Sequence, residues 1–340
     1  MFTSKMQQID RKKWRMRGFT LLAVGLSIFW LAAGSFEFIP AWILRDPADD
    51  IHLWHIAELA ALAALLLGGV MLGLIRRPQE KPLLAQYFLL SMLIGFVGLL
   101  PFNIDALVLG VGTSMLGLGT LPLNTVSVGL LFLAGSFVLA YPEPRALLSF
   151  RPKGRISIAL LVLTLVFAVF LDPVINREIY YQITGMANLD AHALQYHWIG
   201  SALLMVLLIV AGLMASTKRP GWKILGFITG EVYIYLGVIT MIVPSYAGSW
   251  GEASGLFAIF GGVLYMMITL AEAEGTDEKA RKSAREPEPE PVAAPEVLPE
   301  TSTVTAPASE PVFVPEALTV YKTRELNEMS ELEPIGVGRK

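Results

Sequence analysis

The sequence predicts an all-α integral membrane protein with eight transmembrane helices, built as a 4+4 parallel internal repeat and followed by a disordered C-terminal tail. Three observations lead to this prediction. Hydrophobic residues make up 54% of the 340 residues, and charged residues only 16%. Several apolar runs reach the roughly 20 residues that a helix needs to cross a hydrocarbon core of about 30 Å. The basic residues gather in every second connection between these runs.

Eight apolar segments are expected to span the membrane. They cover residues 18–38, 54–75, 84–102, 119–140, 156–174, 197–216, 223–244 and 254–273. The Gly-rich window 105–118 leaves the start of the fourth segment poorly defined and suits an interfacial or re-entrant piece. The first segment follows a basic stretch and runs into FEFIP with no small-residue cleavage site. It is therefore expected to be an uncleaved helix rather than a signal peptide.

The orientation follows from the basic residues, because cytoplasmic segments collect Lys and Arg. Of the 26 basic residues, all but Arg45 and Arg177 fall on one side of an eight-span arrangement. Both termini are thus predicted to be cytoplasmic, in the cell (inner) membrane. The chain has no Cys, which excludes disulfides, thiolate ligands and a thiol nucleophile.

The expected organisation has five parts. They are a basic N-terminus (1–17), a first four-helix unit (18–140), a cytoplasmic linker (141–155), a second four-helix unit (156–274) and a cytoplasmic tail (275–340). The tail is rich in Pro, Glu, Ala and Thr, and it cannot bury enough apolar surface to order itself. Its residues 315–332 regain helix-forming character. This segment is either a frayed end or a docking segment for a cytoplasmic partner.

Two segments share a gapless register, which suggests an internal repeat. LWHIAELAALAALLLGGVMLG at 53–73 aligns with QYHWIGSALLMVLLIVAGLMA at 195–215, so that His55 coincides with His197. Before each segment stand an acid, a Pro, an Arg and an Asp-x-His step. These are Glu37, Pro40, Arg45, Asp50 and His52 in the first copy, and Asp172, Pro173, Arg177, Asp190 and His192 in the second. Units with an even number of spans would be parallel repeats. A chance match of apolar helices is the alternative.

All four histidines lie in these two settings, at the predicted outer ends of the second and sixth spans. Neutral imidazole is an axial ligand of b-type haem and also suits Zn, Cu and Fe. We therefore expect His55 and His197 to share one haem or transition-metal site, with His52 and His192 further out in the loops. Asp50 and Asp190 are candidates to orient a ligating imidazole. Arg45 and Arg177 are candidates to bind a propionate or another anion.

Each of these residues also has an ordinary structural role. Asp50 and Asp190 are good helix N-caps. Histidine at a membrane interface needs no ligand, and Arg177 followed by Glu178 could form an ordinary surface pair of little energetic weight. The sequence leaves both readings open, so the expected cofactor is a b-type haem, a transition metal or none.

The layout resembles heme A synthase, a family with eight spans in two four-helix halves. The resemblance rests on the topology and on His55 and His197, which match haem-ligating positions on the second helix of each half. It would imply partner histidines on the fourth helix of each half. Here LPLNTVSVGLLFLAGSFVLA and GLFAIFGGVLYMMITLA contain none, and the family's loop cysteines are absent. The resemblance therefore implies a topology and a haem-type site but not haem A synthesis.

Two carboxylates stand out. Glu58 is predicted to share a helix face with His52 and His55, because the three residues step by three along the chain. Glu231 falls near the middle of the seventh span, where an ionisable group costs roughly 2.5–3.5 kcal/mol on insertion scales. Glu231 is expected to be protonated, hydrogen-bonded within the bundle or facing a wet cavity. Its possible functions are proton relay, contact with a quinone headgroup and substrate binding. The alternative is a structural role, in which a neutral carboxyl forms hydrogen bonds between helices.

Three functions remain open at this point. The leading one is an integral membrane subunit of a bioenergetic, electron-transfer complex that contacts lipids, other membrane subunits and a cytoplasmic partner through its tail. The second is a proton-coupled transporter using Glu231, and the third is a cofactor-free scaffold subunit. No phosphate loop, HExxH, nucleophile elbow or dinucleotide fingerprint is present. Enzymatic activity is therefore left open, and nucleic-acid binding has no support.

Overall fold

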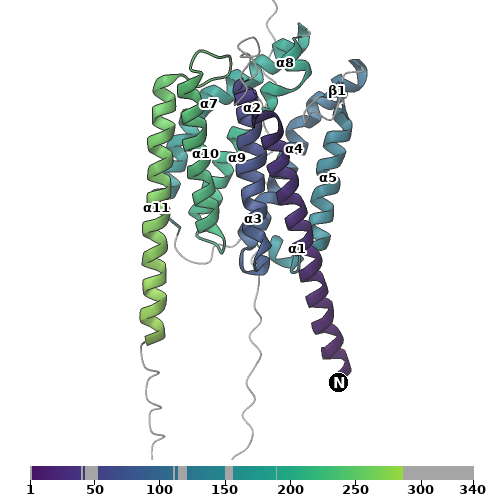
Figure 1. Cartoon of the computed structure of the whole chain (residues 1–340), viewed down its shortest axis with the longest axis vertical. Helices are drawn as coiled ribbons and strands as arrows, with labels where there is room; N and C mark the ends of the chain where they lie inside the picture. Colours follow the sequence, from purple (N-terminus) through teal and green to yellow (C-terminus); the bar gives the residue numbers. More distant parts are fainter. Residues whose placement is uncertain are drawn as a thin grey trace, which may run out of the picture. The chain divides into compact units, whose positions relative to one another are not determined.

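The chain is a multi-pass helical membrane protein, seen here in a computed structural model (Figure 1). The structure describes residues 2–39, 41–42, 53–109, 112–113, 121–149, 156–188 and 190–285. Residues 1–286 form one compact unit. Within the described residues, seven helices are long and apolar enough to cross a membrane. This confirms the predicted helical membrane class.

The long helices follow the predicted spans closely. In chain order they are α1 (Phe2–Ile39), the continuous run of α2 (Leu53–Ala60), η3 (Ala61–Gly68) and α3 (Gly69–Ile75), then α4 (Pro82–Leu109), α5 (Leu123–Ala140), α7 (Ile158–Ala187), α9 (His197–Ser216), α10 (Trp222–Ile242) and α11 (Glu252–Arg285). The helix α5 corresponds to the fourth predicted span, but only its apolar part Ser127–Ala140 is described in full, which is shorter than a span requires.

Short elements join the long helices. They are η4 (Pro78–Glu80), α6 (Pro144–Leu147), α8 (Ala191–Leu194) and the antiparallel pair of β1 (Gly112–Thr113) and β2 (Leu121–Pro122). The pair β1–β2 lies in and beside the window 105–118, and the rest of that window outside α4 and β1 is not described. Figure 1 shows that α1 begins and α11 ends at the same end of the bundle, while α8 and β1 lie at the opposite end.

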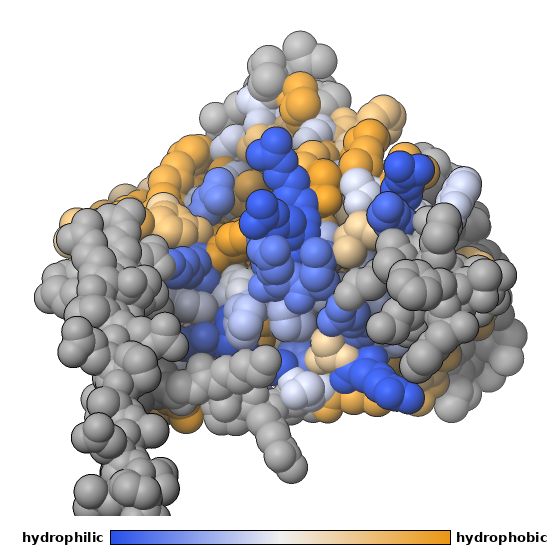
Figure 2. Space-filling view, turned by 90° about the horizontal axis from the view of Figure 1, so that it is seen from below, coloured by the Kyte–Doolittle hydropathy of each residue, from blue (hydrophilic) through white to orange (hydrophobic). Residues whose placement is uncertain are grey.

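The core lies between the helices, and apolar side chains also cover their outward faces. Trp54, Tyr87, Phe167 and Tyr233 are fully or almost fully buried, and the Phe167 and Tyr233 rings stack at 3.8 Å between centroids. Large apolar residues such as Phe260 remain exposed on the sides of the helices. Seen from the end where α1 begins, hydrophilic side chains gather in the middle and hydrophobic ones along the rim (Figure 2). Apolar sides with a polar end suit a bundle surrounded by lipid.

Glycines set the spacing between α10 and α11. A Cβ built on Gly230 would lie 2.8 Å from the Gly262 carbonyl oxygen, and one on Gly262 would lie 2.6 Å from the Gly230 carbonyl oxygen. Gly237 and Gly255 form a second reciprocal pair, with corresponding distances of 2.7 and 2.9 Å. The two backbones touch at both points, which only residues without a side chain permit.

Small residues of the second span pack against α1. A Cβ on Gly34 would lie 2.8 Å from the Ala64 Cβ, and one on Gly68 would lie 3.4 Å from Leu31. This contact coincides with the π-helical run η3, where the helix widens by one residue per turn. Ala57 and Ala61, earlier in the same span, are fully buried.

Several helix ends differ from the sequence prediction, and α1 begins at Phe2 although the first span was expected to begin at residue 18. The third span was expected to end at residue 102, but α4 continues through Pro101 to Leu109. The fifth was expected to end near residue 174, but α7 continues through Pro173 to Ala187, so Asp172, Pro173 and Arg177 lie in a helix and not in a loop. A packed helix tolerates Pro because its neighbours support the interrupted turn. The helix α11 extends to Arg285, so residues 275–285, expected to open the tail, are helical.

Candidate functional site

Three of the four histidines meet at the end of the bundle where α8 lies. His55 comes from the first turn of α2, His192 from α8 and His197 from the first residue of α9. The His55 ring centroid is 5.2 Å from that of His197 and 5.5 Å from that of His192, and the last two are 5.7 Å apart. One ring nitrogen from each residue can be chosen so that all three lie within 4.8 Å of one another. The sequence-predicted pair is therefore part of a three-histidine cluster.

A sharp corner between α8 and α9 brings His192 and His197 to the same side. Tyr196 has a φ of 61°, in the left-handed region that a bulky residue rarely adopts. Tyr196 is 1% exposed, so burial of its ring supports the strained backbone. At the start of α8, the Asp190 carboxylate accepts a hydrogen bond from the Ala193 N–H at 3.1 Å, which is the N-cap predicted for it.

Gln182 connects α7 to both helices that supply these two histidines. Its side-chain amide donates to the Ala193 carbonyl of α8 at 2.8 Å and accepts from the Ile199 N–H of α9 at 3.2 Å. The side chain is fully buried. Gly185, one turn further along α7, allows α8 to approach, because a Cβ there would lie 2.5 Å from the Ala193 Cβ. The relative placement of His192 and His197 thus depends on α7.

A buried carboxylate stands behind His55. The His55 Nδ1 lies 3.3 Å from Glu58 Oε2, and Glu58 is 3% exposed. The Ser201 hydroxyl, on α9, donates to the same oxygen. Donation from a protonated Nδ1 to this carboxylate would make Nε2 the ligating nitrogen of His55, as in metal sites whose histidines are oriented by an acid.

Aromatic side chains enclose the cluster. The Trp198 ring packs edge-on against His55 at 4.6 Å between centroids and also lies 5.6 Å from His192. The Tyr181 ring also packs edge-on against Trp198, at 5.1 Å between centroids. His55 is 7% exposed and the His192 side chain 19% exposed. The cluster is thus open to solvent from the side of His192 and closed toward the helix core.

Arg177 and Glu178 hold the neighbouring loop. Arg177 donates to Glu178 Oε1 at 3.0 Å and to the Gly248 carbonyl at 2.7 Å, in the connection between α10 and α11. Glu178 is fully buried, so this is not the ordinary surface pair that the sequence left open. The guanidinium is engaged by the loop, although it was expected to bind an external anion.

The donor set of the cluster suits a transition-metal ion. Imidazole nitrogen binds Zn and Cu well, with Zn–N bonds of about 2.0–2.1 Å. Three imidazoles leave a fourth position for water or another ligand. A b-type haem would need its flat macrocycle between two axial imidazoles. Here the imidazoles pack against one another and against Trp198, which favours a single ion over a haem.

The remaining sequence-predicted residues fall into two groups. Arg45, Asp50 and His52 lie outside the described residues. The expectation that His192 sits further out than the shared site is wrong, because the corner at Tyr196 folds it back onto His55 and His197. Asp190 Oδ1 lies 4.0 Å from His192 Nδ1, which is too long for a hydrogen bond.

Glu231 does not lie inside the bundle. It is exposed on the outer surface of α10, whereas Val232 and Tyr233 next to it are buried. The expectation that it forms hydrogen bonds within the bundle or faces an interior cavity is therefore wrong. Because α10 is apolar around its whole circumference, its sequence could not show which side faces the core.

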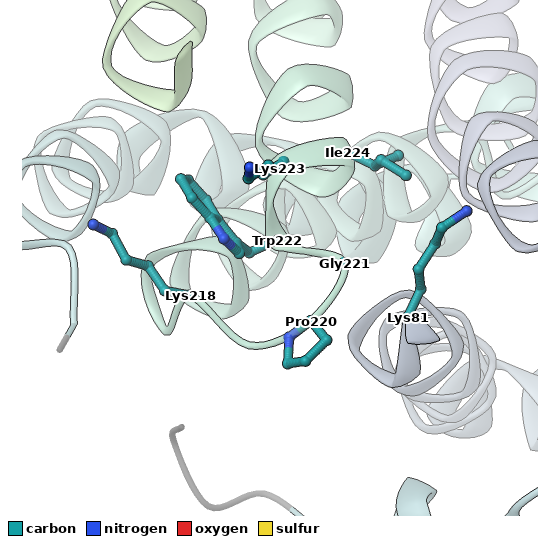
Figure 3. A pocket seen from close by; sticks show the side chains of 7 residues that line it. All are labelled: Lys81, Lys218, Pro220, Gly221, Trp222, Lys223 and Ile224. Atoms are coloured by element: carbon teal, nitrogen blue, oxygen red, sulfur yellow. The ribbon is translucent and has the colours of Figure 1, made fainter. Parts of the chain in front are cut away.

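A cavity of about 340 Å³ lies at the opposite end of the bundle, lined by Lys81, Lys218, Pro220, Gly221, Trp222, Lys223 and Ile224 (Figure 3). Its lysines do not converge: Lys81 and Lys218 extend away from each other. Lys81 donates to the Gly73 carbonyl at 2.7 Å, and burial lowers the pKa of its ammonium group, with the Glu80 charge acting in the opposite direction. Lys218 pairs with Glu272. These contacts engage the Lys81 and Lys218 ammonium groups near the ends of helices, so the two lysines do not form a binding site in the cavity.

Sequence reasoning missed Trp198 and Gln182, and it named Glu178 only as a possible surface partner of Arg177. Glu178 and Gln182 are polar residues one turn apart in a segment that was assigned to a loop, where polar side chains carry no signal. Had the helix been extended past Pro173, their i, i+4 spacing would have placed them on one face.

No family model, curated protein or solved structure matches the chain. The functional argument therefore depends on the geometry of the site.

Proposed function

We propose that the protein binds one divalent transition-metal ion, Zn²⁺ or Cu²⁺, through His55, His192 and His197. The single observation that carries this proposal is the convergence of three imidazoles from three different helices within 4.8 Å of one another. The Glu58 carboxylate behind His55 supports it, because acids commonly orient and strengthen metal-binding histidines.

We further propose that the chain is an eight-span protein of the cell (inner) membrane, with two parallel four-helix units and both termini cytoplasmic. The distribution of the basic residues supports this, since all but two of the 26 fall on one side. The metal site would then face the outside. Labelling of Arg45→Cys with an impermeant maleimide in intact cells tests this orientation, because the chain has no native Cys. Protection of position 45 would contradict it.

The role proposed for this site is that of a metal-holding subunit in a bioenergetic membrane complex. Copper would support electron transfer, because it changes oxidation state, whereas zinc would serve structure or Lewis-acid chemistry. The tail is proposed to tether a cytoplasmic partner. No contact of the described residues favours the transporter alternative, since Glu231 lies on the outer surface of α10.

Metal analysis of the gently purified protein tests the proposal. Zinc, copper and iron would be measured per chain, together with the visible spectrum. We expect about one zinc or copper ion and no Soret band in the wild type, and loss of the ion in His55→Ala, His192→Ala and His197→Ala. Gln195→Ala, in the corner between α8 and α9, is the matched control and should keep the ion. A wild type that is metal-free and takes up neither ion would contradict the metal site and favour the cofactor-free scaffold function. A Soret band would show that the protein binds haem.

A further inference from the structure

Glu231 is an acid on the outside of a membrane helix. It is the tenth residue of α10, which spans 21 residues from Trp222 to Ile242, so it lies near the middle of the helix. Its side chain is exposed, as are those of Val238 and Ile242 two and three turns further along the same side. Ionisable residues at mid-membrane depth almost always face protein or water, because lipid tails offer no compensation.

The residues that the structure describes do not compensate this charge. No hydrogen bond or ion pair joins Glu231 to another described residue. The basic residues of the described apolar spans stand at the start of a span or are engaged by the chain. Lys223 stands at the start of α10, Lys13, Arg15 and Arg17 stand at the start of the apolar span of α1, and Arg177 donates to the Gly248 carbonyl. A second copy of the chain would therefore offer no described cation at this depth.

We propose that the outer face of α10 around Glu231 docks a transmembrane helix of a different chain, which presents a Lys or Arg side chain to the carboxylate. An ion pair at this depth compensates each charge for its lost hydration. The exposed Val238 and Ile242 supply apolar contact on the same face. This inference rests on the proposal that the chain is a subunit of a membrane complex, and it is independent of the histidine cluster.

The test uses the tagged full-length chain, expressed from its own gene in the cells that make it and extracted in mild detergent. Native gels would give the fraction of the chain in a larger complex, and mass spectrometry would identify the added subunits. Glu231→Asp keeps the charge, Glu231→Gln removes it and Glu231→Lys reverses it. Glu252→Gln, an exposed acid at the first residue of α11, is the matched control.

We expect Glu231→Asp and Glu252→Gln to retain the complex, and Glu231→Gln and Glu231→Lys to reduce its fraction at least tenfold. Exchange of the charges, with Glu231→Lys paired with an acid at the partner's basic position, should restore it. Unfolding temperatures of the isolated chains should be equal, because Glu231 supports no internal contact. A complex that survives Glu231→Lys overturns the docking face but keeps the subunit role; absence of any complex in the wild type overturns both.

Crosslinking identifies the occupant. The variant Val238→Cys keeps the Glu231 carboxylate and carries the only thiol of the chain, since the protein has no Cys. A bifunctional thiol–amine reagent in native membranes should join position 238, on the same face as Glu231, to a chain of different mass. A disulfide-linked dimer of the chain would mean that a second copy covers the face. Unhindered labelling by a lipid-soluble maleimide would mean that lipid covers it. Either result overturns the proposal.

Discussion

The Glu58 carboxylate lies between the His55 imidazole of its own helix and the Ser201 hydroxyl of α9, and both contact the same oxygen, Oε2. The two halves of the chain are thereby joined directly behind the histidine cluster. The contact also fixes the direction of the His55 ring, since its Nδ1 faces the acid.

Replacement of Glu58 should weaken metal binding without removing a ligand. Glu58→Gln keeps the shape of the side chain but loses the anionic acceptor, so the apparent Kd for zinc or copper should rise about 10- to 100-fold. Competition with a chelator of known affinity would measure it. Ser201→Ala should have a smaller effect, because it removes only the support of the acid. Equal affinities of wild type and Glu58→Gln would show that the acid does not orient His55.

The approach of α8 to α7 should also control metal affinity. Gly185→Ala places a Cβ 2.5 Å from that of Ala193, so α8 must shift and take His192 with it. Overpacking of this kind costs about 1–3 kcal/mol, which corresponds to about a 5- to 150-fold loss of affinity if the strain acts on the bound state. Gly200→Ala, on α9, meets nothing within 4 Å and should bind normally. The same chelator competition decides the outcome.

The glycine contact between α10 and α11 should be sensitive to a single methyl group. Gly262→Ala would press against the Gly230 carbonyl oxygen at 2.6 Å, and we expect a loss of about 1–3 kcal/mol in the free energy of unfolding. Gly275→Ala on the same helix meets nothing within 4 Å and should be neutral or slightly stabilising, because Ala favours helix. Thermal unfolding in detergent compares the two. Equal unfolding temperatures would contradict the close packing.

Arg177 and Glu178 should behave as a buried pair. Arg177→Met leaves the fully buried Glu178 carboxylate without its cation, which should lower the free energy of unfolding by about 3 kcal/mol. This is the lower end of the usual range, because the Arg177 side chain is 34% exposed. The double change Arg177→Met with Glu178→Gln should recover much of this loss. A double-mutant cycle in unfolding free energy gives the coupling. Additive losses would mean that the pair does not interact.

Much of the fold follows from the apolar runs, because a helix in lipid must be about as long as the hydrocarbon layer is thick. The ends of helices do not follow in the same way. The sequence marks where apolar character stops, near Asp172 and Gly275, but α7 and α11 continue as helices beyond these points. Hydrogen bonds and packing carry the helix past the boundary, and hydropathy does not register them.

The contact between His55 and His197 could be anticipated from their shared register, but the position of His192 could not. That position depends on the left-handed backbone conformation of Tyr196. Tyrosine is not among the residues that favour turns, so the sequence does not predict a corner there. The two aligned segments also differ in structure: Ala61–Gly68 is π-helical, whereas the equivalent residues 203–210 are part of the α-helix α9. The π-helical run coincides with the close approach of Gly34 on α1 to Ala64, a tertiary contact that the sequence does not show.

The three histidines belong to segments far apart in the chain, α2 on one hand and the corner of α8 and α9 on the other. An ion held by all three would act as a reversible crosslink between the two halves of the chain. Its binding energy would add to the folding energy by mass action: about 2.7 kcal/mol when the free ion is at 100 times its Kd. The free energy of unfolding of the bundle would then rise with the free metal concentration on the side of the membrane that the cluster faces.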